Sequence, residues 1–125
     1  MVKRMVQRTP AKILRLHLSE RDRYHGAPLY EAVVSKCRLL GIAGATVFRG
    51  FEGYGESTQI HRAGILAHDL PITVTIIDSA VNVERLMLEL KNLLNTGLVA
   101  VSDVEMIRIE RDAGRGSAEP RPPST

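Results

Sequence analysis

Hydrophobic and polar residues alternate along residues 12–18. Leu14, Leu16 and Leu18 fall on one side of the segment, and Arg15 falls on the other. A period of two is typical of a strand with one buried face. We therefore expect the first strand here, with its leucines turned toward a core.

Three more segments favour strands. Residues 44–49 and 72–78 are rich in β-branched residues, and residues 99–111 contain a final apolar stretch that is clearest over residues 104–109. Such residues pack well on a pleated surface. The pattern predicts a second and third strand in mid-chain and a fourth near the C-terminal end.

Two segments show helical spacing instead. Apolar residues recur every three or four positions over residues 28–40 and 80–95, which is typical of amphipathic helices. Gly41 and Gly97 stand where helix ends favour glycine. Asp78 or Ser79 can cap the start of the second helix.

The order of elements is therefore βαββαβ. It predicts an α+β, ferredoxin-like sandwich: a four-stranded antiparallel sheet with both helices on one face and a long loop between the second and third strands. Leu14, Val74, Ile76 and Met106 would face the helices, leaving large aliphatic residues on the open face: Ile13, Ile77, Ile107 and Ile109. An open apolar face usually meets a partner, so we expect oligomerisation, with cover by the tails or the long loop as the alternative.

The two ends differ from the body. Residues 1–10 are basic and polar and predict a flexible arm, and residues 112–125 are rich in Gly, Pro and Ser and predict a disordered tail. The folded domain would span residues 11–111. The net charge of +3 belongs mainly to the ends, and no basic stripe crosses the body, which favours solvated tails over nucleic-acid binding.

The rest of the composition limits the kinds of site that the chain can form. Cys37 is the one cysteine, and we expect its side chain to be buried as a small hydrophobic residue. A chain that cannot form an internal disulfide is expected in a reducing, cytoplasmic compartment. No apolar run is long enough for a membrane span. The four histidines lack the spacing of a metal site, and no nucleophile–base set is recognisable. The sequence predicts neither metal nor catalytic residues.

Residues 50–70 form the long loop. Neighbouring antiparallel strands need only a short turn, and loops beyond about 12–15 residues are usually functional or disordered. Gly50, Gly53 and Gly55 permit positive φ and close approach to a ligand. A ligand cradle and an extended β-ribbon with glycine bulges are both compatible with this pattern.

A second polar cluster covers residues 19–26. It leads into the first helix, whose N-terminus favours anions. Glu20, Arg23 and His25 are its candidate ligand-binding residues. The alternative is a solvated turn held by local ion pairs.

Three motifs together resemble the uncharacterised PII-like family of small bacterial and archaeal proteins. They read ERDRYHGAPLYEA over residues 20–32, GIAGATVFRGFEGYG over residues 41–55, and IH at residues 60–61. More distantly, residues 41–47, Pro71 and residues 104–109 resemble the PII nitrogen-regulatory proteins. The resemblance implies a homotrimer with ligand sites between subunits, where the base of the long loop meets the next subunit's last strand.

By this resemblance the chain is a signalling protein that binds an effector and regulates a partner, such as a transporter or an enzyme, through its long loop. Residues 95–99 lack lysine and Ile72 replaces the lysine that follows proline in PII proteins, so a triphosphate would lack charge partners. An adenine nucleotide such as AMP is therefore the expected ligand. The predicted ligand-binding residues are Glu20, Arg23, His25, Arg49, Gly50, Gly53, Tyr54, Gly55, Ser57, His61 and Arg108.

Two other functions share the element order. A small hydrolase of the acylphosphatase type needs an anion cradle after the first strand, where Glu20 and Asp22 would repel phosphate. An RNA-recognition motif needs aromatic residues on the central strands, which carry Arg15, His17 and threonines instead. We therefore favour a non-enzymatic regulator that does not bind nucleic acid.

Overall fold

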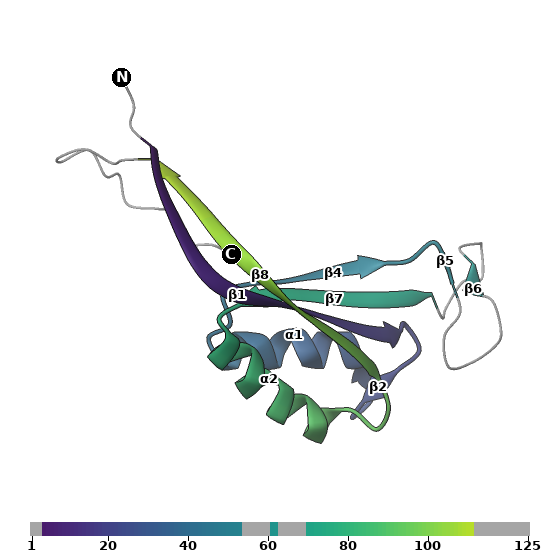
Figure 1. Cartoon of the computed structure of the whole chain (residues 1–125). Coiled ribbons are helices and arrows are strands. Elements are labelled where there is room, and N and C mark those ends of the chain that lie inside the picture. Colours follow the sequence, from purple (N-terminus) through teal and green to yellow (C-terminus); the bar gives the residue numbers. More distant parts are fainter. Residues whose placement is uncertain (1–3, 54–60, 63–69, 112–125) are drawn as a thin grey trace.

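The computed structural model describes residues 4–53, 61–62 and 70–111. In that part of the chain, four strands form one antiparallel sheet in the order β4-β7-β1-β8, and two helices cover one of its faces (Figure 1). The main elements are β1 (Arg4–Ser19), α1 (Leu29–Leu39), β4 (Ala45–Arg49), β7 (Pro71–Asp78), α2 (Ala80–Leu93) and β8 (Leu98–Arg111). The ferredoxin-like α+β prediction is confirmed.

Four short strands add to this order. They are β2 (Arg23–Tyr24) with β3 (Ala27–Pro28), and β5 (Glu52–Gly53) with β6 (His61–Arg62). Each pair forms a small two-stranded sheet of its own. Strands β2, β5 and β6 belong to segments that the sequence predicts as loops, whereas β3 includes Pro28, which the sequence predicts as the first residue of the first helix.

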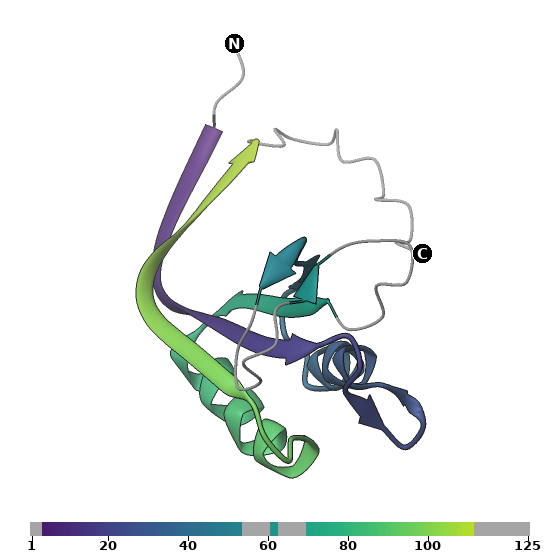
Figure 2. The ribbon, with the colours of Figure 1, turned by 90° about the vertical axis from the view of Figure 1, so that its right-hand side faces the viewer.

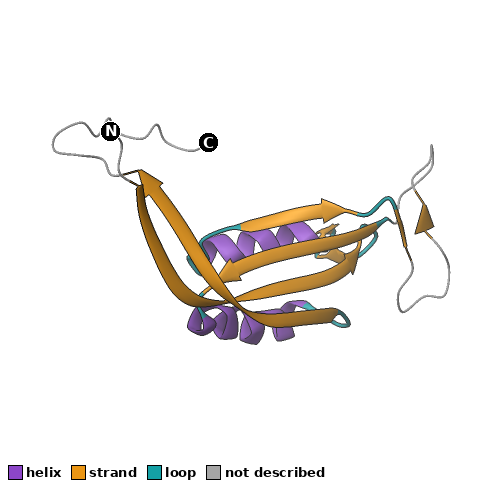
Figure 3. Cartoon of the chain, turned by 45° about the horizontal axis from the view of Figure 1, so that its top comes forward, coloured by secondary structure: helices purple, strands orange, loops and turns teal. Residues whose placement is uncertain are grey.

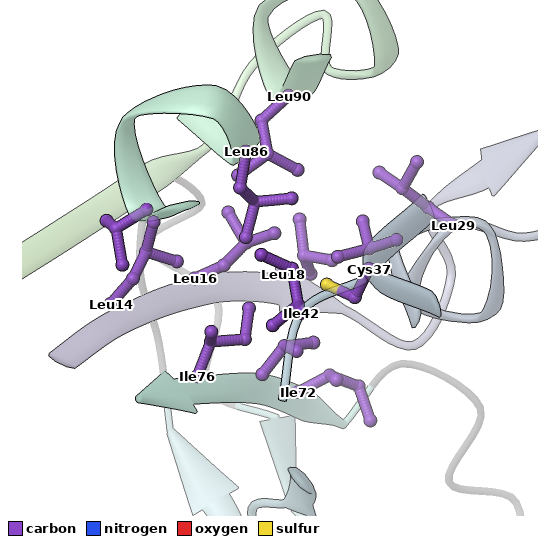
Figure 4. Close-up of a cluster of buried hydrophobic side chains, with 13 residues drawn as sticks. Leu14, Leu16, Leu18, Leu29, Cys37, Ile42, Ile72, Ile76, Leu86 and Leu90 are labelled. Atoms are coloured by element: carbon purple, nitrogen blue, oxygen red, sulfur yellow. The ribbon is translucent and has the colours of Figure 1, made fainter. Parts of the chain in front are cut away.

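The core lies between the sheet and the helices (Figure 4). The predicted period of two is observed: Leu14, Leu16 and Leu18 of β1 are buried, and so are Ile72 and Ile76 of β7. The helices contribute the rest of the core: Leu29, Val33, Cys37, Val83, Leu86 and Leu90. Leucine, isoleucine and valine thus supply most of the core volume in a chain with few aromatic residues.

Helix α1 ends at a Schellman motif. Gly41 has φ of 72°, which costs little without a Cβ. Its N–H donates to the Arg38 carbonyl at 3.2 Å, and the N–H of Ile42 donates to the Cys37 carbonyl at 2.9 Å. These are the two bonds of the motif, so the predicted role of Gly41 is confirmed.

Helix α2 begins at a double cap. The Ser79 hydroxyl accepts from the N–H of Asn82 at 3.2 Å, and the Asp78 carboxylate accepts from the Ser79 N–H at 2.7 Å and from the N–H of Ala43 at 2.9 Å. Burial of Asp78 acts to raise its pKa, but these hydrogen bonds and one from the Asn82 side chain outweigh it, so its pKa lies below the ordinary 3.8. Asp78, at the end of β7, is therefore hydrogen-bonded to Ala43 in the connection between α1 and β4.

Strands β1 and β8 continue beyond the helices as a two-stranded terminal ribbon, formed by residues 4–11 and 104–111 (Figures 1 and 2). The flexible arm predicted for residues 1–10 is wrong from Arg4 onward, because these residues pair with β8. The prediction ended the arm at Pro10, because proline is uncommon inside a strand. A proline is tolerated here because, among the described residues, this part of β1 pairs along one edge only. Arg8 and Glu105 form an ion pair at 2.6 Å across the ribbon.

Within the described ranges, one face of the sheet carries no helix (Figure 3). Its residues are only partly the predicted ones. Ile13 and Ile77 do pair on it, and Ile77 is 41% exposed. Met106 pairs with Thr9 and so lies on the Ile13 side of the ladder, opposite to its predicted face. Ile107 and Ile109 have the parity of Leu14 but lie in the terminal ribbon, beyond the helices. The error arises because the face of each β8 residue is set by its register with β1, which no local pattern shows, and because residues 104–111 extend beyond the core.

Candidate functional site

Several predicted site residues meet at one end of the sheet, where β1 and β4 end and β7 begins (Figure 1). The pairing register sets Ser19 opposite Pro71 and Arg49 opposite Ile72. Glu20, Arg49 and Gly50, which directly follow or end these strands, are therefore neighbours in space although they are far apart in sequence. We call Glu20, Arg49, Gly50 and Leu70 the loop-base site.

Two backbone hydrogen bonds close the base of the long segment. The N–H of Gly50 donates to the Pro71 carbonyl at 2.6 Å, and the N–H of Glu20 donates to the Leu70 carbonyl at 2.9 Å. A Cβ on Gly50 would lie 2.6 Å from Cγ of Pro71. The close approach that Gly50 permits here is thus to the chain itself.

An ion pair crosses the same base. Nη2 of Arg49 lies 2.7 Å from Oε1 of Glu20; the Arg49 side chain is 55% exposed, and that of Glu20 is 22% exposed. The second oxygen of Glu20, Oε2, is buried and has no hydrogen-bond partner among the described residues. The structure therefore places a half-exposed arginine side chain beside a carboxylate that has one oxygen in an ion pair and the other buried without a hydrogen-bond donor among the described residues.

Within the long segment, the two short strands β5 and β6 pair antiparallel. Glu52 lies opposite Arg62, and Gly53 lies opposite His61. The β-ribbon interpretation of this segment is confirmed at these positions, and it does not exclude a ligand nearby. Tyr54, Gly55 and Ser57, which the sequence predicts to bind ligand, lie outside the described residues.

In the turn after β1, backbone N–H groups donate hydrogen bonds to acceptors of the turn itself. The Ser19 N–H donates to Oδ2 of Asp22, the Asp22 N–H donates to the Ser19 carbonyl, and the Arg21 N–H donates to Oγ of Ser19, at 2.8, 3.0 and 3.2 Å. The Glu20 N–H is taken by Leu70. An anion cradle of the acylphosphatase type needs such N–H groups to be available, and in this turn they already have acceptors.

The predicted residues Arg23 and His25 belong to a tight hairpin. Arg23 pairs with Pro28 and Tyr24 with Ala27, so His25 and Gly26 occupy the turn with φ of 50° and 83°. The His25 ring packs edge-on against Tyr24, with ring centroids 4.3 Å apart. Both predicted side chains are exposed; the ring contact gives His25 a local structural role.

Arg108 is not brought to the loop-base site of its own chain. It lies in the terminal ribbon opposite Gln7, and its Nη1 is 3.7 Å from Oε1 of Glu110. The terminal ribbon and the β5–β6 pair lie at opposite ends of the sheet (Figures 1 and 3). Arg49 and Arg108 of one chain therefore cannot contact one ligand molecule.

Features of other kinds of site are lacking in the described part of the chain. There, no three residues of the metal-binding types come together, and neither helix has the length and apolar character needed to cross a membrane. Cys37 is buried, and burial raises the pKa of its thiol to about 11. A thiol with that pKa is a poor nucleophile near neutral pH.

The fold and the site together define a ferredoxin-like protein with a long insertion between β4 and β7, and an ion pair at the base of that insertion. The sequence profile of the DUF190 family (Uncharacterized ACR, COG1993) matches residues 11–106. The chain belongs to this family. The resemblance drawn from the motifs is confirmed, and the match nearly coincides with the predicted folded domain.

Relatives in the family are close enough to align over most of their length. A UPF0166 protein of Aquifex aeolicus is 38% identical over 98 residues, which cover 77% of this chain and 92% of that protein. A UPF0166 protein of Methanocaldococcus jannaschii is 30% identical over 105 residues, covering 80% and 94%. The shared region is therefore nearly the whole of each relative.

Solved structures that share this fold include PII-like proteins. CPII of Thiomonas intermedia K12, a nitrogen regulatory PII-like protein bound to ADP, AMP and bicarbonate, has a TM-score of 0.61 at 18% identity, covering 80% of this chain and 91% of that one. A putative PII-like signalling protein of Thermus thermophilus has a TM-score of 0.59 at 15% identity, covering 79% and 91%. At these identities the likeness establishes the fold.

Proposed function

We propose that this protein is a PII-like homotrimeric regulator that binds a small adenine nucleotide, with AMP as the leading candidate, in clefts between subunits. The bound effector would regulate a partner, such as a transporter or an enzyme, through residues 50–70. The protein would act in the cytoplasm and would not itself catalyse a reaction.

The observation that carries the proposal is the half-exposed side chain of Arg49 at the loop base. Its side chain is 55% exposed and is held by one carboxylate oxygen. A guanidinium has five N–H donors arranged to suit phosphate and carboxylate groups. CPII of Thiomonas intermedia, with the same fold, is bound to ADP and AMP, which supports an adenine nucleotide as the ligand class.

A ligand with few phosphates fits the surroundings of this site. Ile72, next to Pro71, is 1% exposed and belongs to the core, so this position offers no cation. The connection between α2 and β8 spans only residues 94–97 and contains no basic residue. A triphosphate is stabilised by several charge-assisted hydrogen bonds, and these positions do not supply them.

The positions of Arg49 and Arg108 support a site shared between subunits. They lie at opposite ends of one chain, so a second copy must supply Arg108 if both contact the ligand. The exposed aliphatic residues of the terminal ribbon and open face, including Ile109 at 62% and Leu98 at 64%, also favour an oligomer. Symmetric closed assemblies use one such surface in every subunit.

Calorimetric titration of the purified protein with AMP, cyclic AMP, ADP and ATP tests the ligand. We expect AMP or ADP to bind more tightly than ATP, and Arg49→Gln to weaken AMP binding at least about tenfold, because a charge-assisted contact is lost. Native mass spectrometry tests the trimer. No binding of any of the four nucleotides, or a monomer at every concentration, would overturn the proposal.

The absence of catalysis is tested separately. Incubation with acetyl phosphate and with ATP, followed by phosphate detection, should give no turnover above the buffer rate. Turnover that Arg49→Gln abolishes would favour the hydrolase alternative instead.

A further inference from the structure

We propose that Glu20 is an internal competitor for Arg49: its carboxylate occupies the guanidinium in the ligand-free chain, and an anionic ligand must displace it. This inference rests on the proposed nucleotide function, because it assigns the regulation of that same site. It makes Glu20 an autoinhibitory residue rather than a ligand contact.

The contact is well placed for exchange. It is a single interaction, 2.7 Å between Nη2 of Arg49 and Oε1 of Glu20, rather than a two-pronged carboxylate–guanidinium pair. More than half of the Arg49 side chain remains exposed. A phosphate can therefore approach other N–H groups of the same guanidinium before the carboxylate leaves, and the exchange passes through no unpaired arginine.

The carboxylate itself gains little from its present position. Oε2 of Glu20 is buried without a hydrogen-bond partner in the described part of the chain. A buried carboxylate oxygen without a donor has lost its hydration and has not replaced it. The Glu20 side chain thus depends on its contact with Arg49, and removal of that partner by a ligand favours return of the carboxylate to water.

The position of the pair links the exchange to both ends of the long segment. The backbone N–H of Glu20 holds the Leu70 carbonyl at 2.9 Å. Arg49 directly precedes Gly50, whose N–H holds the Pro71 carbonyl at 2.6 Å. Separation of the two side chains is therefore expected to change the protection of both anchoring amides, which gives a readout independent of affinity.

The turn around Glu20 explains why the competitor is held in place. The Ser19 and Asp22 backbones and the Asp22 side chain are joined by hydrogen bonds of 2.8 and 3.0 Å. The backbone of Glu20 is fixed between these bonds and Leu70, whereas its side chain depends on Arg49. A ligand would then move the Glu20 side chain and loosen its anchor to Leu70, while the hydrogen bonds between Ser19 and Asp22 stay in place.

The test compares four proteins: the unmodified chain, Glu20→Gln, the control Glu84→Gln, and the double variant Glu20→Gln with Arg49→Gln. Glu84 is an exposed glutamate in α2, which begins at the opposite end of β7 from the loop-base site. Its substitution removes the same charge from the protein. Each variant is titrated with AMP and with adenosine, and the protection of the backbone amides at position 20 and at Gly50 is followed by hydrogen exchange.

We expect Glu20→Gln to bind AMP about tenfold more tightly than the unmodified chain, since one competing charge-assisted contact is removed. Adenosine affinity should not change, because adenosine has no phosphate for Arg49. Glu84→Gln should match the unmodified chain, and the double variant should lose the gain. AMP should lower the protection of both anchoring amides in the unmodified chain.

The outcomes separate this inference from the proposed function. If the unmodified chain binds AMP and Glu20→Gln binds it equally or more weakly, the nucleotide function stands and the competitor role is wrong; a weaker Glu20→Gln would make Glu20 a ligand contact. If Glu20→Gln gains affinity for adenosine as well, charge competition is wrong. If none of the four proteins binds AMP, both proposals fail.

Discussion

In the sheet half of the β1–β8 pair, Leu14 and Leu16 are fully buried, whereas in the terminal ribbon Val6 is 53% exposed and Ile109 is 62% exposed. The same two strands run through both halves in one unbroken register, from Arg4 opposite Arg111 to His17 opposite Leu98. The halves differ in what covers them. Helices and β7 lie against the first, and neither reaches the second.

This contrast shows what a hydrogen-bonded ladder does and does not supply. Backbone pairing sets the geometry of both halves, but an isolated pair of strands is marginally stable in water, and burial of an apolar face is what stabilises it. The described residues do not cover the terminal ribbon in this way, and in the proposed trimer a second copy of the chain would supply that cover.

The largest expected effect on stability is in the covered half of the β1–β8 pair, the half that the helices and β7 lie against. Leu16→Ala should lower the free energy of unfolding by about 2–5 kcal/mol, because it leaves a cavity at a fully buried site. Val6→Ala in the ribbon should change it by less than about 0.5 kcal/mol in a dissociated subunit. Urea unfolding at low protein concentration measures both. Equal losses would show that the ribbon is buried within the single chain.

The ribbon is expected to matter for association instead. Replacement of Ile107 and Ile109 together by Ser should weaken oligomer formation at least about tenfold, because a buried Ile side chain contributes about 1.5–3 kcal/mol. The matched control replaces Leu39 and Val81, two exposed aliphatic residues of the helices, and should leave association unchanged. Sedimentation equilibrium measures both; an unaffected oligomer would remove the ribbon from the interface.

Asp78 gives an intermediate effect in the covered half. Asp78→Ala removes acceptors from Ala43, Ser79 and Asn82 and should cost about 1–2 kcal/mol. The pKa of Asp78 is lowered in the folded state, so its contribution is present above pH 3.8 and is lost as the pH falls through the folded value. The difference between the two proteins should therefore shrink in acid, as thermal melts between about pH 2 and 7 would reveal. A difference that grows toward low pH would contradict the assigned sign.

The smallest effect is chemical and is read from the reactivity of a thiol rather than from stability. Cys37 is 2% exposed and its thiol pKa is raised to about 11, so it should resist a thiol reagent at about pH 8 until the protein is unfolded. A cysteine placed in the ribbon by Thr9→Cys, with Cys37→Ser, should react rapidly in a dissociated subunit. Colorimetric thiol titration compares the two. Rapid reaction of native Cys37 would show that α1 opens readily.

Much of the covered half could be predicted because local patterns and tertiary packing agree there. The alternation of Leu14, Leu16 and Leu18 predicted a strand that the sheet confirms, and Gly41 predicted a helix end that the Schellman motif confirms. The ribbon was missed because Pro10 and the basic residues before it resemble an unstructured arm. Its strand state depends on residues 104–111, which are distant in sequence.

The candidate site divides in the same way. Glu20, Arg49 and Gly50 could be selected as polar or glycine residues beside predicted strands, but their meeting depends on the register of β1, β4 and β7. No feature of the sequence indicates that Oε2 of Glu20 lacks a hydrogen-bond donor, because the donors available to a carboxylate depend on its neighbours in space.

By itself, the sequence determined the order of elements, the core-facing side of β1 and the family, since these follow from periodicity, helix-end chemistry and motifs along the chain. The tertiary structure alone decided that the two ends of the domain pair into a ribbon, that Arg49 is held by Glu20, and that Arg108 lies far from both. These are contacts between residues remote in sequence, and their formation depends on strand register and twist, which no local pattern encodes.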